Sequence, residues 1–204
     1  ELVGQVPVAD LGEASADARV EAYRRVIVVQ WSLVVFLAVH LVLRGLPPAD
    51  LMLDLPSTTR AWGALLVAGA LTMAVFASAR GALQTREKRD DVRRQIESVR
   101  AMIPHTPREA RWFRVVAWTA GICEEILYRG FILWYLAQLV PMAWAVILSS
   151  LLFGMAHAYQ GTRGVLQTSA VGLVLGLLTL FSGSLWAPML LHAFIDINSG
   201  LLAY

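Results

Sequence analysis

Apolar residues fill long stretches of the chain without interruption by charge. Residues 26–43 and 61–79 carry no formal charge, and neither does the stretch 130–156. A membrane-spanning helix needs roughly 20 consecutive apolar residues, so each of the first two stretches is long enough for one span. Pro141 divides the third stretch at a natural helix boundary, because proline cannot continue a helix from its N-terminal side.

A fourth apolar stretch, 164–195, is too long for one span. Ser182-Gly183-Ser184 has the composition of a turn and divides it in two. A further helix must carry Glu124, which lies between the second and third stretches. The pattern therefore predicts an all-α, polytopic membrane helix bundle of about six transmembrane helices, at 25–45, 60–80, 114–139, 142–158, 164–182 and 185–204.

Two polar segments flank the first pair of spans. Residues 1–24 are expected to be an N-terminal tail, either frayed or forming a short surface helix. The stretch from Arg80 to Arg111 holds nine basic and five acidic residues, and its part 86–100 is predicted to be a charged helix. This helix is either a solvated loop helix or a contact for lipid headgroups or substrate. The predicted organisation is an N-terminal tail (1–24), two transmembrane helices (25–80), a cytoplasmic basic loop or helix (81–111) and a catalytic intramembrane core (112–204).

Basic loops of membrane proteins stay in the cytoplasm, which predicts an orientation. Arg24 and Arg25 precede the first span and the basic loop follows the second, so the N-terminus is expected inside. No cleavable signal peptide is visible. Because the chain begins with Glu1 and not with methionine, its natural start is expected to be missing. The expected location is a bacterial or archaeal cell membrane.

Composition agrees with a lipid environment and excludes several other classes. Hydrophobic residues make up 57% of the 204 residues and charged residues 16%, whereas soluble domains carry about 25% charged residues. A net charge of +2 is too small to predict binding to nucleic acid. The single cysteine, Cys123, excludes a disulfide framework and a cysteine-rich metal site.

Ionisable groups inside a bilayer are costly and mark functional sites, and here they form three groups at helical spacing. In the first, Glu125 and Arg129 are four residues apart, so they share a helix face and are expected to form an ion pair. Glu124 points about 100° away from Glu125 and has no local partner, which suits it to exchange protons. Alternatively, the pair is a purely structural salt bridge and Glu124 faces water.

The second and third groups lie in later spans. His157 follows Phe153 near the inner end of the fourth span, and His192 and Asp196 are four residues apart in the last one. Taken singly, each could be a helix-end or interhelical polar contact, and a hydrogen-bonded His192–Asp196 couple is one expectation. Taken together, a carboxylate, two imidazoles and an acid on three helices are what water activation and oxyanion stabilisation require.

The ordered set of motifs E-E-x-x-x-R, F-x-x-x-H and H-x-x-x-N/D resembles the type II CAAX prenyl endopeptidases and the wider CPBP (Abi) family of intramembrane proteases. The matching residues are Glu124-Glu125…Arg129, Phe153…His157 and His192…Asp196, within residues 110–204. The resemblance implies that Glu124 and His157 activate a water for peptide hydrolysis and that His192 and Asp196 stabilise the oxyanion. It also implies that Glu125 and Arg129 are a structural pair and that Phe153 supports the site.

Asp196 departs from the asparagine typical of the prenyl proteases. An amide can donate to an oxyanion and an ionised aspartate cannot, so Asp196 is protonated, or orients His192, or takes part in different chemistry. Glu124, His157 and His192 could also form a two-histidine, one-carboxylate zinc site. No cofactor is certain from the sequence, and zinc is the candidate.

The sequence therefore predicts an intramembrane endopeptidase acting near the cytoplasmic face on a peptide or on a protein, with or without a prenyl group. A bacterial member of the family could instead process peptides such as bacteriocins. The alternatives are a non-catalytic membrane immunity or partner protein with the same fold, which Asp196 favours, and a proton-coupled transporter. In the remaining spans, Gln30 and His40 are expected to form interhelical hydrogen bonds, and the G-x-x-x-G of Gly172 and Gly176 is expected to allow close helix packing.

Overall fold

Helices account for nearly all of the chain that the structure describes. The computed structural model describes residues 16–45, 51–82 and 99–203, and these residues contain no strand. If α4, η4 and α5 are counted as one continuous helix, six helices are present there, which confirms the predicted all-α bundle. The elements are α1 (Ala16–Leu43), α2 (Thr59–Ala82), η3 (Arg100–Met102), α4 (Pro107–Glu125), the π-helical η4 (Ile126–Ile132), α5 (Leu133–Ala137), α6 (Met142–Ala156), η5 (Ala158–Gln160), α7 (Gly161–Ser182) and α8 (Trp186–Ala203).

The helices extend past several of the predicted spans. α1 begins at Ala16 and α4 at Pro107, each ahead of the apolar stretch that it contains. The reason is that hydrophobicity marks where the lipid ends, while the helix itself continues into polar turns beyond it. Most of the predicted tail (1–15) and most of the predicted charged helix over 86–100 lie outside the described residues.

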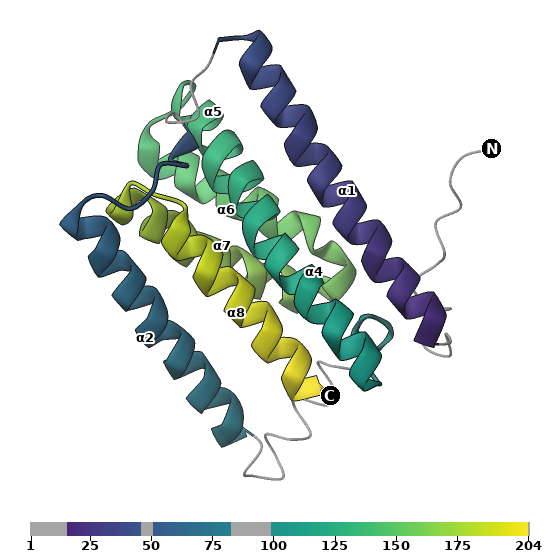
Figure 1. Ribbon diagram of the computed structural model, residues 1–204. Helices are drawn as coiled ribbons and strands as arrows, with labels where there is room; N and C mark the ends of the chain where they lie inside the picture. Colours follow the sequence, from purple (N-terminus) through teal and green to yellow (C-terminus); the bar gives the residue numbers. More distant parts are fainter. Residues whose placement is uncertain (1–15, 46–50, 83–98, 204) are drawn as a thin grey trace.

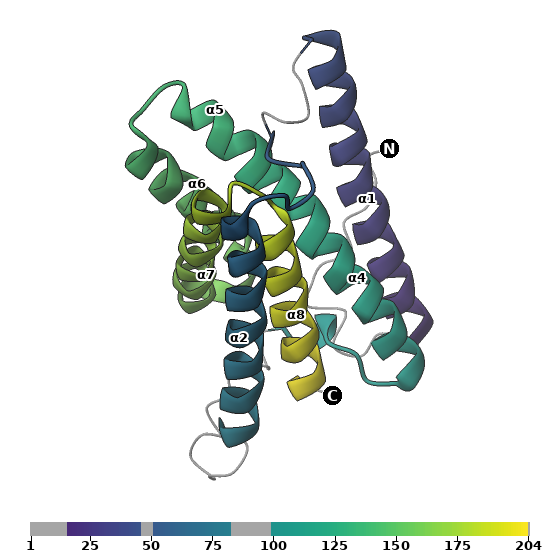
Figure 2. The same cartoon turned by 60° about the vertical axis from the view of Figure 1, so that its left-hand side comes forward.

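Four helices lie side by side in the order α2, α8, α4, α1, and the α6–α7 hairpin packs behind them (Figure 1). In Figure 2 this hairpin is seen next to α2 and α8, on the side away from α1. α1 packs mainly against α4 and so forms one edge of the bundle. The arrangement brings the three predicted motifs together: α4 packs on α8, and α6 packs on η4, which continues α4.

The outer surface of the bundle is apolar, as a lipid environment requires. Large side chains such as Phe36, Leu66 and Met73 are mostly exposed. Three described segments, Ala16–Leu43, Thr59–Ser78 and Ala158–Ser182, are long and apolar enough by length and composition to cross a membrane. α4 and α8 are not among these segments, because the charged start of α4 and the polar site residues of α8 lower the mean hydropathy of each helix. The chain is a membrane protein.

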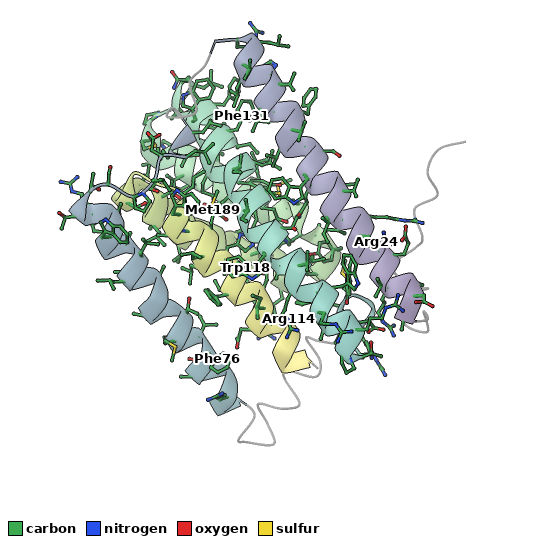
Figure 3. The ribbon with its side chains drawn as sticks, viewed as in Figure 1. Arg24, Phe76, Arg114, Trp118, Phe131 and Met189 are labelled. Carbon is green, nitrogen blue, oxygen red and sulfur yellow. The ribbon has the colours of Figure 1, made fainter. Side chains whose placement is uncertain are left out.

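Basic residues gather at the end of the bundle where α1 and α4 begin and α2 ends. Figure 3 shows Arg24 and Arg114 toward this end and Phe131 toward the opposite one. This distribution supports the orientation predicted from the sequence, in which the basic end is cytoplasmic; the orientation itself remains a prediction. The basic residues of these three helix ends are Arg19, Arg24, Arg25, Arg80, Arg108, Arg111 and Arg114.

A buried clamp joins α1 to α4 at the basic end. Thr106 caps α4 by accepting from the backbone N–H of Glu109, with proline at the first helical position. The fully buried Glu109 carboxylate accepts from Arg19 of α1 at 3.2 Å and from the backbone N–H of His105 at 2.6 Å. Burial raises the pKa of Glu109, but the hydrogen bonds from His105 and Arg19 outweigh it and leave the pKa lowered. Tyr23 adds a 2.8 Å hydrogen bond to the Met102 carbonyl.

Glycines allow the close helix packing that brings the motif helices together. A Cβ on Gly121 of α4 would lie 2.8 Å from both the Cβ and the backbone nitrogen of Ala193 in α8. On α7, a Cβ on Gly176 would lie 3.2 Å from Val146 of α6. A Cβ on Gly172 would lie 3.1 Å from the Arg129 guanidinium. The packing role predicted for Gly172 and Gly176 is therefore confirmed.

Candidate active site

Glu125 and Arg129 form the predicted ion pair at the end of α4. Arg129 Nη1 donates to Glu125 Oε1 at 2.7 Å, and both side chains are almost completely buried. Arg129 Nη2 also donates to the Gly172 carbonyl of α7 at 3.1 Å. The guanidinium lies over the Phe153 ring, with 4.2 Å from Cζ to the ring centroid. The pair thus connects three helices.

A π-helical segment begins directly after these carboxylates. In η4 the backbone N–H of Leu133 reaches back five residues to the Tyr128 carbonyl, which also accepts from Ser149 Oγ of α6 at 2.9 Å. Such wide turns are rare and are frequent at functional sites. Here the turn ties α6 to the helix that carries Glu124 and Glu125.

His192 of α8 is oriented by Glu125. Its Nδ1 lies 2.7 Å from Glu125 Oε1, and a carboxylate accepts, so Nδ1–H donates. This bond directs Nε2 toward Glu124, with Nε2 3.8 Å from Oε2. The Phe153 ring lies edge-on to His192 at a centroid distance of 5.6 Å. Glu125 therefore holds two site cations in place, Arg129 and, when it is protonated, His192.

His157 stands where α6 ends. Its Nδ1 lies 2.9 Å from the Phe153 carbonyl, which only accepts, so Nδ1 carries the proton and donates. A neutral His157 then presents a bare Nε2, which lies 3.9 Å from Glu124 Oε2. Phe153 contacts both imidazoles, since its ring centroid is also 4.8 Å from that of His157.

Glu124 lies between the two histidines. Its Oε1 accepts a 2.7 Å hydrogen bond from Gln30 Nε2 of α1. Its Oε2 is buried and has no hydrogen-bond partner among the described residues, although both histidine Nε2 atoms lie just beyond hydrogen-bond range. A buried carboxylate oxygen without a donor is costly, and a gap of this width is one that a water molecule bridges.

Asp196 is on the site face of α8 but does not form the expected couple with His192. The distance from His192 Nε2 to Asp196 Oδ2 is 3.7 Å, outside hydrogen-bond range, and the expectation of a hydrogen-bonded couple is wrong. Helical spacing does place both side chains on one face, but Glu125 from the neighbouring α4 occupies Nδ1 instead. Asp196 is about one-third exposed, more than any other member of the site.

The predicted zinc ligands lie farther apart than the ligands of a tetrahedral zinc. Ligand atoms of a tetrahedral zinc lie about 2.0–2.1 Å from the metal, and hence about 3.3 Å from one another. Glu124 Oε2 lies 3.8 and 3.9 Å from the two histidine Nε2 atoms. Within the described residues no group of three or more His, Cys, Asp or Glu side chains meets the geometry of a metal site. The side chains as placed do not fit a tetrahedral zinc.

The structure thus brings every predicted site residue to one place. The residue that sequence reasoning did not assign to the site is Gln30, which was expected only as an interhelical hydrogen-bonding residue. A polar amide in an uncharged apolar stretch was the available signal, but the pattern could not show which helix it faces. His40, the other expected interhelical residue, is exposed and forms no side-chain hydrogen bond within the described chain, so that expectation is wrong.

Comparison with known proteins places this site within a family. Residues 106–198 match the family model described as "Type II CAAX prenyl endopeptidase Rce1-like". Neither a curated protein nor a solved structure matches the chain significantly. The matched stretch contains all three motifs and excludes α1 and α2. Residues 106–198 are therefore an Rce1-like domain of the type II CAAX prenyl endopeptidases, a family of membrane proteases that act on peptide or protein substrates.

Proposed function

We propose that the chain is an intramembrane endopeptidase in which Glu124 and His157 activate a water molecule near the cytoplasmic face. The observation that carries this proposal is the buried Glu124 Oε2, which has no partner and faces two histidine Nε2 atoms at 3.8 and 3.9 Å. A water between these atoms can donate one hydrogen to Glu124 and the other to His157. Its oxygen lone pair is then free to attack.

The reaction balances with one water consumed. The water oxygen forms a bond to the peptide carbonyl carbon, Glu124 takes a water proton, and the carbonyl electrons move onto its oxygen. Collapse of this tetrahedral species re-forms the C=O bond, breaks the C–N bond and delivers the proton from Glu124 to the leaving nitrogen. The products are a carboxylic acid and an amine.

His192 is proposed to stabilise the oxyanion. Carboxylate oxygens of Glu125, Asp196 and Glu124 lie 2.7, 3.7 and 3.8 Å from its ring nitrogens, and this surrounding negative charge favours an imidazolium. Its Nε2–H can then donate to the developing negative oxygen, as a preorganised donor must. Asp196 supports the charge of His192 in this scheme and need not donate itself.

Cleavage by the purified protein in liposomes tests the proposal. Matched peptides with and without a C-terminal isoprenoid are incubated with wild type, Glu124→Gln and, as a control, Glu21→Gln, whose carboxylate is about half exposed at the start of α1. We expect cleavage by wild type and Glu21→Gln and none by Glu124→Gln, since acid–base catalysis contributes about 10²–10⁴-fold.

The alternatives give different results. A non-catalytic partner protein would leave every peptide intact and would keep its cellular phenotype in Glu124→Gln. A proton-coupled transporter would move protons across the liposome membrane and lose that flux in Glu124→Gln. Dependence of cleavage on the isoprenoid would identify prenylated proteins as the substrate class.

A further inference from the structure

A residue outside the family domain contacts the proposed catalytic carboxylate. Gln30 lies in α1, 94 residues before Glu124 and well ahead of the matched region 106–198. Its Nε2 donates to Glu124 Oε1 at 2.7 Å, a short bond to a charged acceptor. The motifs of the family domain supply no donor to this oxygen in the described residues, so α1 completes the surroundings of Glu124.

α1 is fixed against α4 on both sides of Gln30. Toward the basic end, the clamp of Arg19 with Glu109 holds it. Toward the other end, Leu37 and Leu41 form a buried cluster with Leu51, and Ile126 and Leu127 of η4, which continues α4, pack against this cluster. An amide carried on a helix that is held at two levels loses little freedom when it forms its hydrogen bond, which is what a preorganised site requires.

No second hydrogen bond within the described chain explains the presence of a polar Gln30 side chain in an apolar helix. Its Oε1 is buried and without a hydrogen-bond partner, and the bond to Glu124 is the one that its side chain forms within the described chain. An amide that serves only to join helices gains most when both of its polar ends are paired. Gln30 leaves its Oε1 unpaired in the described chain, and the carboxylate that it contacts leaves Oε2 unpaired as well, as expected beside a site that takes up water.

The hydrogen bond decides how the carboxylate is turned. Because Gln30 holds Oε1, rotation about the Cγ–Cδ bond of Glu124 is restricted and Oε2 is left facing His157 and His192. We propose that Gln30 is a positioning residue that fixes Glu124 in the orientation for water activation, an inference that rests on the proposed function. In the protease, α1 is then part of the active site and not only a membrane anchor.

Kinetics of Gln30 variants test this assignment. Gln30→Met keeps the length of the side chain and removes the donor, and we expect kcat to fall about 10–100-fold with KM within about 2-fold of wild type. The matched control is Tyr23→Phe, which removes another α1 hydrogen bond, that to the Met102 carbonyl at the basic end. It should leave kcat unchanged, and both variants should keep the wild-type melting temperature within a few degrees.

A charge substitution gives a readout that a purely structural role would not produce. In Gln30→Glu the new group donates only when it is protonated and otherwise repels the Glu124 carboxylate. The ratio of its kcat to that of wild type should therefore rise as the pH is lowered. A pH-independent ratio, or a kcat of Gln30→Met equal to wild type, would overturn the assignment.

A chemical measurement decides the inference without any cleavage. A hydrophobic carbodiimide labels protonated carboxyl groups in membranes, and loss of an N–H donor increases the protonated share of a carboxyl. Labelling of Glu124, located by peptide mass spectrometry with Glu124→Gln as the blank, should be several-fold faster in Gln30→Met than in wild type and in Tyr23→Phe. Equal rates would refute the positioning role. If wild type cleaves no peptide while labelling changes as expected, the protease proposal fails and the Gln30–Glu124 coupling stands.

Discussion

Replacement of Arg129 by methionine should be among the most damaging single changes outside the proposed catalytic residues. Methionine roughly fills the space of the arginine stem but removes the charge. Glu125 would then remain fully buried without its arginine, and His192 would be its one remaining partner within the described residues. The hydrogen bond to the Gly172 carbonyl and the contact with the Phe153 ring would be lost as well.

The size of the expected loss of stability follows from the burial of the Glu125–Arg129 pair. Breaking a buried ion pair by removal of one partner costs about 3–5 kcal/mol, because the remaining charge is left uncompensated. For a chain of this length, 1 kcal/mol corresponds to roughly 2–4 °C in melting temperature, so we expect a decrease of about 6–20 °C. Arg25 and Glu21 have the same i, i+4 spacing but are both more than half exposed, so Arg25→Met should cost less than about 1 kcal/mol.

Thermal unfolding of the detergent-purified variants measures both effects. The double variant Glu125→Gln/Arg129→Met removes both charges and should be more stable than Arg129→Met alone. Measured with wild type and the single variant Glu125→Gln, it completes a double-mutant cycle. The reasoning is refuted if Arg129→Met melts within about 2 °C of wild type, or if the double variant is no more stable than the single one.

Three further predictions concern the clamp, the helix packing and metal. The folded-state pKa of Glu109 is lowered from 4.5, so its stabilising contribution should be complete above pH 4.5 and be lost as the pH falls through the folded-state pKa. The unfolding free energies of wild type and Glu109→Gln should therefore converge in acid. A difference between them that does not change with pH would contradict this prediction. Gly121→Ala forces α4 away from the Ala193 backbone and should destabilise the protein by about 1–3 kcal/mol. The control Gly63→Ala, whose new Cβ meets no atom within 4 Å, should not destabilise it. Equal melting temperatures of Gly121→Ala and wild type would contradict the prediction and would show that α8 moves aside without cost. Removal of metal with o-phenanthroline, checked by elemental analysis, should leave cleavage intact, and activity that is lost and then restored by zinc would assign a metal to Glu124, His157 and His192.

The spacing of residues along the chain was sufficient to predict a contact where both partners lie on one helix. The Glu125–Arg129 pair was predicted from a separation of four residues, since helix geometry alone brings such side chains together. The family resemblance carried by the three motifs implied that Glu124 and His157 act on one water molecule, but their distance could not be obtained from the sequence. Hydrophobic stretches predicted the six helices, because a lipid environment leaves few other folds available.

Contacts between helices could not be predicted from the pattern of residues along the sequence. His192 and Asp196 share a helix face, yet the hydrogen bond goes to Glu125, because the packing of α4 on α8 through Gly121 decides which carboxylate is nearest. Gln30 was recognisable as a polar residue in an apolar helix, but its partner depends on how α1 is placed against α4. The π-helical turn after Glu125 has no recognised sequence signal, and only the structure shows it.

The central claim is that Glu124 and His157 act together on one water molecule, and a kinetic double-mutant cycle tests it most directly. Single-turnover cleavage of one peptide substrate would be measured for wild type, Glu124→Gln, His157→Gln and the double variant in liposomes. Groups that act as a unit have non-additive effects. We predict that each single variant loses about 10²-fold or more and that the double variant loses no more than the worse single one. Losses that multiply in the double variant, or a single variant with wild-type activity, would contradict the claim.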